Sequence, residues 1–112
     1  MTEPRLKTDL WIRAQIRLCD ISFIPAVIGR KGDPDAGQVI IRRDLRNGTC
    51  ELFARTILDD GGRGWRRLGG TAPLDRDAAD ILVDRECGFD PDIWVLEIED
   101  PERRYTLDAP LV

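Results

Sequence analysis

The last third of the chain constrains the fold most, because it contains a complete helix-to-strand unit. Asp75 is a favourable N-cap residue, and apolar side chains recur at helical spacing after it. The pattern predicts a helix that ends at Gly88, with Phe89 folding back on Val83. Apolar and polar side chains then alternate over residues 93–99, which predicts a strand with one buried face.

The first 70 residues show one amphipathic helix followed by strands. Residues 9–20 predict the helix, and its apolar stripe is expected to be buried: Leu10, Trp11, Ala14 and Leu18. Strands are predicted at residues 23–30, 38–44, 49–58 and 65–68, and a short last strand at 104–107. We therefore expect one α+β domain over residues 1–112, with a single, mostly antiparallel sheet and two helices on one face. Its order is helix, three to four strands, helix and terminal hairpin.

Asn47 and Gly48 join two of these strands and set their predicted register. Asn-Gly is a strong signal of a two-residue hairpin turn, because both residues tolerate positive φ. This register places Arg42 opposite Phe53. One sheet face then holds the core, and the other carries four residues that we predict to bind a protein partner: Ile40, Arg42, Phe53 and Arg55.

Two arguments bear on that sheet face. Arginine opposite an aromatic ring permits a cation–π contact, and arginine with aromatic residues is typical of binding hot spots. The alternative is that a helix or the terminal hairpin covers the face, or that single apolar residues are exposed there without a role.

The residue types that carry most enzyme chemistry are absent or badly spaced. The chain has no histidine, and its three cysteines form no CxxC pair, so no zinc site and no cysteine nucleophile are expected. The loops at residues 31–37 and 59–64 are read as turns, because they lack the ligands of a calcium loop and the lysine of a phosphate loop. We predict no catalytic residue, metal or cofactor; an enzyme with an unrecognised site is the lesser alternative.

Three segments together resemble a known family: KGDPDAG at residues 31–37, the isolated Trp65, and FDPDIWVLEIED at residues 89–100. The chain is similar over nearly its whole length to short alphaproteobacterial proteins known as domain of unknown function 1491. It departs in small ways, such as Asp75 where relatives tend to have a serine-type cap. The resemblance implies no catalytic residue, cofactor or partner.

Charge and hydropathy limit the partners. The net charge is −4, yet residues 1–71 hold 13 basic and 9 acidic side chains, whereas residues 72–112 hold 4 and 12. This asymmetry permits the alternative of a nucleic-acid accessory protein with an arginine-rich sheet surface. The longest uncharged run, residues 21–29, is too short for a bilayer, and no signal peptide is visible, so no membrane partner is expected. We predict a cytoplasmic, non-catalytic binding protein that pairs with another protein or with itself.

The alternative of a nucleic-acid accessory protein would use seven arginines, and its binding to nucleic acid would weaken as the salt concentration rises. They are Arg42, Arg43, Arg46, Arg55, Arg63, Arg66 and Arg67. The acidic C-terminal third argues against it.

Overall fold

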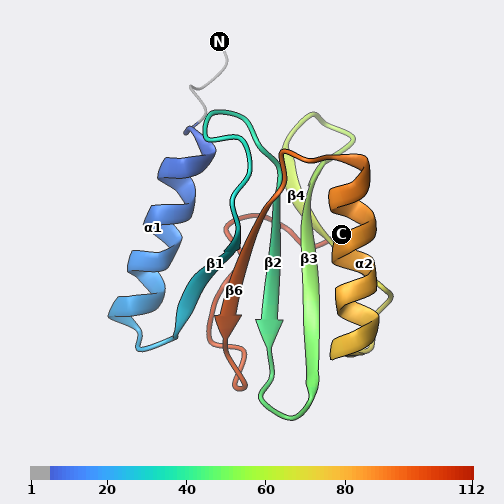
Figure 1. Cartoon of the computed structure of the whole chain (residues 1–112). Helices are drawn as coiled ribbons and strands as arrows, with labels where there is room; N and C mark the ends of the chain where they lie inside the picture. Colours follow the sequence, from blue (N-terminus) through green and yellow to red (C-terminus); the bar gives the residue numbers. More distant parts are fainter. Residues whose placement is uncertain (1–5) are drawn as a thin grey trace.

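The computed structural model describes residues 6–112 and contains two helices and six strands (Figure 1). The helices are α1 (Thr8–Ile21) and α2 (Arg76–Phe89). The strands are β1 (Ala26–Arg30), β2 (Val39–Asp44), β3 (Thr49–Ile57), β4 (Arg63–Leu68), β5 (Leu74–Asp75) and β6 (Trp94–Glu99). The expected α+β class is confirmed.

All six strands belong to one sheet. Its order is β1-β6-β2-β3-β4, with β5 paired to β3. β6 pairs antiparallel with β1 and parallel with β2, and every other pairing is antiparallel. The sheet is therefore mostly antiparallel, as expected. The predicted terminal hairpin is wrong, because residues 104–107 form no strand and the last strand lies inside the sheet.

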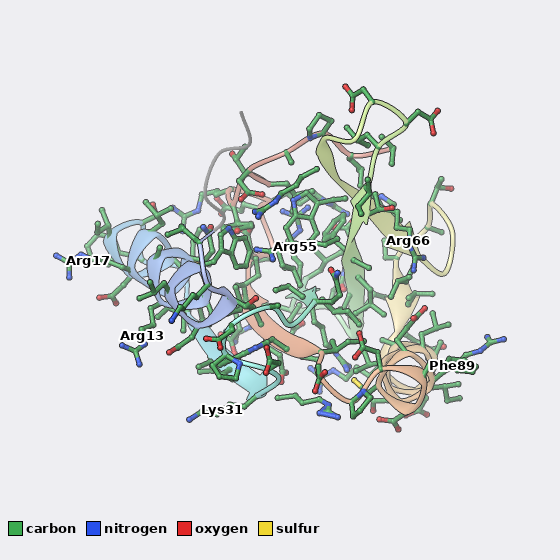
Figure 2. All side chains as sticks on the ribbon, turned by 90° about the horizontal axis from the view of Figure 1, so that it is seen from above. Arg13, Arg17, Lys31, Arg55, Arg66 and Phe89 are labelled. Carbon is green, nitrogen blue, oxygen red and sulfur yellow. The ribbon has the colours of Figure 1, made fainter. Side chains whose placement is uncertain are left out.

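The two helices lie on opposite faces of the sheet (Figures 1 and 2), which corrects the expectation that both cover one face. One core cluster joins α1 to Trp65, Trp94 and Leu96. The other joins Ala79 of α2 to Ile40. Both faces of the central strands are therefore covered by a helix. Because both faces are buried, apolar residues follow one another along these strands and do not alternate with polar ones.

Helix α1 buries Trp11 as predicted, but not the rest of the predicted stripe. Trp11, Ile12 and Cys19 are at most 4% exposed, whereas Leu10 and Leu18 are 49% and 56% exposed. The helix is apolar on two neighbouring stripes, and the one with the largest side chains packs on the sheet. A second apolar stripe is left at the surface.

Helix α2 begins as predicted and ends differently. The Asp75 Oδ1 atom accepts a hydrogen bond of 2.8 Å from the Ala78 N–H, which confirms the N-cap. The helix continues through Gly88 to Phe89, because Gly88 does not adopt the positive φ of a helix-terminating glycine. Phe89 is 83% exposed and does not fold back into the core.

The β2–β3 hairpin differs from the predicted register by one residue. The Leu45 N–H donates to the Thr49 carbonyl at 3.0 Å, and a three-residue turn lies between them. Arg46 adopts a φ of 61° in this turn and Gly48 a φ of 87°. Because strand side chains alternate, a shift of one residue in the pairing exchanges which residues of β3 share a face with those of β2.

Candidate interaction surface

The four residues predicted to form one binding face lie on two faces. Ile40 pairs with Ala54 and packs under α2, where it is 2% exposed. Phe53 pairs with Ile41 and packs on the α1 side, where it is 1% exposed. The premise of a common exposed face is therefore wrong, and its cause is the one-residue error in register.

The two predicted arginines also lie apart. Arg42 reaches α2 and forms an ion pair with Asp80. On the other face, the Arg55 guanidinium stacks 4.3 Å from the ring centroid of Trp11 and 5.8 Å from that of Trp65. Arginine–aromatic contacts do occur here, but inside the fold.

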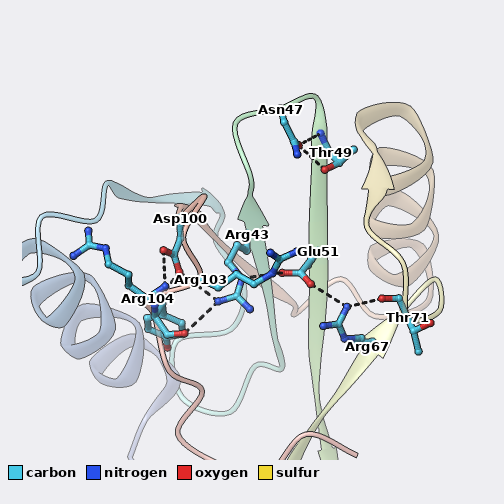
Figure 3. A network of polar contacts seen from close by, with 10 residues as sticks. Arg43, Asn47, Thr49, Glu51, Arg67, Thr71, Asp100, Arg103 and Arg104 are labelled. Carbon is cyan, nitrogen blue, oxygen red and sulfur yellow. Dashed lines mark hydrogen bonds and ion pairs between the residues drawn. The ribbon is translucent and has the colours of Figure 1, made fainter.

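Phe53 contacts two arginines, neither of which is the predicted Arg42. The guanidinium of Arg43 lies 5.1 Å from the Phe53 ring centroid, and that of Arg67 lies 5.5 Å from it. Both arginines also bind Glu51, which neighbours Phe53 in β3. The ring therefore packs against arginines of a polar network around Glu51. Figure 3 shows this network.

Glu51 is the centre of that network. Its Oε1 accepts from the Nε atoms of Arg43 at 3.0 Å and Arg103 at 3.2 Å, and its Oε2 lies 3.0 Å from an Arg67 nitrogen. Burial raises the pKa of Glu51, but the attraction of the three guanidinium groups outweighs it and holds the pKa below its ordinary value. The carboxylate is therefore kept ionised and acts as a structural anchor.

Asp100 extends the network to the C-terminal segment. Burial raises its pKa, but hydrogen bonds from the backbone N–H groups of Tyr105 and Arg104, together with Arg43, lower it overall. Arg43 also donates to the Tyr105 carbonyl at 3.2 Å. These contacts hold the segment that follows β6, at Arg104 and Tyr105, against the sheet.

Several arginines of the predicted nucleic-acid surface are paired with carboxylates of the chain itself. Ion pairs within 4 Å join Arg42 to Asp80, Arg43 and Arg67 to Glu51, Arg46 to Glu99, and Arg66 to Glu86. Each carboxylate lowers the positive charge that a phosphate group would meet. Nucleic-acid binding stays a prediction.

The described residues also show no arrangement typical of redox or metal chemistry. Within residues 6–112, no cluster of three histidine, cysteine or acidic side chains is placed to hold a metal ion. Burial raises the pKa of Cys19, Cys50 and Cys87, so each thiol is held in its protonated form. In the same stretch, no helix has the length and apolar character needed to cross a membrane.

The C-terminal tail closes one edge of the sheet at β4. Trp65 donates its backbone N–H to the Pro110 carbonyl, and the Val112 N–H donates to the Trp65 carbonyl, both at 2.8 Å. These bonds form a parallel bridge between Trp65 and Leu111. The outer edge of β4 is therefore satisfied within the chain at this point.

The opposite edge, at β1, has no further partner strand in the described part of the chain. Among residues 6–112, β1 pairs only with β6. The Glu99 N–H donates to the Pro25 carbonyl at 2.9 Å, and hydrogen-bonded pairs alternate along an antiparallel ladder. The backbone groups of Val27 therefore face β6, and those of Ala26 and Ile28 point outward.

The open edge itself carries exposed apolar side chains. Val27 and Ile28 of β1 are 60% and 37% exposed. Their side chains lie on opposite faces of the sheet, because strand side chains alternate. We call these two residues and the outer backbone of β1 the β1 surface; an uncovered apolar edge strand is typical of an interaction site.

Two shallow grooves adjoin the β1 surface on the α2 side. They have volumes of about 380 and 450 Å³ and share Arg42 and Glu97 in their linings. A Cβ on Gly29 would lie 1.9 Å from a Glu97 carboxylate oxygen, so glycine makes room for that side chain. A β-bulge between Ile28 and Arg30 turns Arg30 toward the second groove.

The sequence model of the DUF1491 family, described as a protein of unknown function, matches residues 6–108. The chain belongs to the DUF1491 family. It is 37% identical to a DUF1491 protein from Caulobacter crescentus solved by crystallography, with a TM-score of 0.84 over 96% of this chain and 100% of that one. An NMR structure of a DUF1491 protein from the same organism gives 36% identity, a TM-score of 0.82, and coverage of 98% and 99%. The solution structure of Atu0922 from A. tumefaciens gives 28% identity, a TM-score of 0.72, and coverage of 86% of each chain.

The function of the DUF1491 family is unknown, which agrees with the resemblance noted in the sequence. No curated protein matches this chain.

In this DUF1491 protein the sequence grouped on one surface residues that the structure places on two faces of the sheet. Leu18 was expected in the core, and nothing in the pattern identified the strand with Val27 as an edge. The available signal was the uncharged run of residues 21–29, which leads from α1 into β1 and contains no lysine or glutamate to protect an edge.

Proposed function

We propose that this DUF1491 protein is a cytoplasmic, non-catalytic binding protein that joins a polypeptide through the β1 surface. The carrying observation is the contrast between the two sheet edges: the C-terminal tail pairs with β4, whereas β1 has only β6 as a partner within residues 6–112. The bound segment is an extended, uncharged strand with apolar side chains, which adds to the sheet by backbone hydrogen bonds.

The composition of the edge supports this partner. Four of the five residues of β1, Ala26 to Gly29, carry no charge, which suits an uncharged partner strand. The three cysteines form no disulfide, which supports a reducing compartment such as the cytoplasm.

The test uses Ile28→Pro. Because the Ile28 N–H points away from β6, proline removes an outward donor without removing a bond of the sheet. Ile28→Thr changes the side chain, keeps the N–H and is the matched control. A photoreactive amino acid at Val27 is irradiated in cytosolic extract, and the adducts are mapped by mass spectrometry.

We expect a polypeptide adduct at Val27 that Ile28→Pro abolishes and Ile28→Thr retains. The same photoreactive group at the exposed Asp59, in the β3–β4 loop, should give no such adduct. Absence of an adduct at Val27, or one indifferent to Ile28→Pro, would overturn the proposal.

A further inference from the structure

We infer that the strand joined by the β1 surface is β1 of a second copy of this chain, paired antiparallel about a two-fold axis at Val27. This rests on the proposed function and names the partner. The outward groups of Ala26 and Ile28 fit this pairing, because Ala26 of each copy then faces Ile28 of the other. Two such pairs, each exchanging two bonds, make four backbone hydrogen bonds.

The side chains are self-complementary in this register. Val27, which is 60% exposed, meets Val27 of the other copy as a pair without mutual backbone bonds, the geometry in which cross-strand side chains lie closest. A register centred on Ile28 would instead set Ala26 against Arg30, beyond the bulge that disturbs the strand. The Val27-centred pairing avoids the bulge and opposes no like charges.

The pairing joins the two sheets on both faces. A two-fold axis perpendicular to the sheet keeps both α1 helices on the same face. Ile28 pairs with Leu96, a core residue on the α1 side, whereas Val27 pairs with Glu97 and lines the groove on the α2 side. The contact therefore covers one exposed apolar side chain of each copy on each face.

Charge substitutions at Val27 test both the surface and the symmetry. Val27→Lys and Val27→Glu each place like charges opposite one another across the axis, so each variant alone should weaken dimerisation about tenfold or more. Val27 lies opposite Glu97 in β6, so the lysine variant gains a neighbouring carboxylate within its own chain and should keep its fold. A mixture of the two variants pairs opposite charges and should recover the dimer, measured by analytical ultracentrifugation.

A cysteine cross-link tests the register. In a Cys87→Ser background, Val27→Cys should form a covalent dimer under mild oxidation. Ile57→Cys is the control, because Ile57 is 69% exposed in β3 and should not cross-link.

Three outcomes would overturn the inference: wild type monomeric at all concentrations, a dimer indifferent to Val27→Lys, or a dimer that Val27→Cys does not trap. The wild type could be monomeric and still give a photo-adduct with another polypeptide that Ile28→Pro abolishes. That result would refute the second copy as the partner but would leave the proposed function intact. If both measurements are negative, both ideas fail.

Discussion

Replacing Glu51 by glutamine should destabilise the protein by about 3 kcal/mol, because one buried carboxylate is the shared acceptor of three guanidinium groups. The substitution keeps the size of the side chain and removes its charge. It therefore isolates the ionic part of the network from its packing.

The magnitude follows from the exposure of each arginine. Removing one partner of a buried ion pair costs about 3–5 kcal/mol. Arg43 has a side chain 9% exposed and bears most of this loss, although it retains Asp100 at 3.3 Å. The side chains of Arg67 and Arg103 are 29% and 50% exposed, so they can turn toward water and lose about 1 kcal/mol or less each. The retained partner places the total at the lower end of the range.

Urea unfolding at neutral pH, followed by tryptophan fluorescence, measures the loss. The matched control is Glu99→Gln, whose ion pair with Arg46 spans 2.9 Å between side chains that are 46% and 60% exposed. This control should lose less than about 1 kcal/mol. Equal losses in the two variants would refute the assignment of Glu51 as the anchor of the network.

The same variant should change the pH dependence of stability. The folded-state pKa of Glu51 lies below its ordinary value of 4.5, so the native state binds this proton less readily than the unfolded state. Its contribution is present above the ordinary value and is lost as pH falls through the lower, folded-state pKa. The difference between wild type and Glu51→Gln should therefore shrink with acidification below 4.5. A constant difference would contradict this reasoning.

Two further predictions concern the stability of other sites. Asp108→Ala should cost about 2 kcal/mol and shift tryptophan emission, because the indole N–H groups of Trp11 and Trp65 donate to Asp108 at 2.8 and 2.9 Å; an unchanged melting temperature would contradict it. Gly69→Ala should cost about 1 kcal/mol more than Gly70→Ala. Both glycines have positive φ, but only at Gly69 would a Cβ come within 2.9 Å of leucine side chains. Equal losses in thermal melts would show that backbone strain alone acts at both positions.

Several features could be predicted from short stretches of sequence. Asp75 caps its helix through a bond to a residue three positions later, so its role needs no distant partner. The Asn47–Gly48 pair likewise predicted the hairpin between β2 and β3, which the structure contains. The type of turn could not be predicted, because Arg46 adopts a left-handed conformation that Asn-Gly alone does not specify.

The candidate site could be predicted only poorly. Ile40 and Phe53 looked like a surface pair because the register was wrong by one residue. Leu18 looked like core because α1 has two apolar stripes, and only the sheet selects between them. The Glu51 network joins β2, β3, β4 and the C-terminal tail. No local sequence pattern predicts contacts among segments so far apart in the chain.

The sequence by itself determined the α+β class, the positions of both helices and most strands, and the DUF1491 family, since these depend on spacing and capping within short segments. The tertiary structure decided which face each helix covers, where β6 inserts, and which edge stays open. These depend on long-range packing: β6 enters between β1 and β2, which leaves β1 as an edge, while the C-terminal tail covers β4. The β1 surface is thus a property of the assembled sheet, although every residue in it lies between positions 26 and 30.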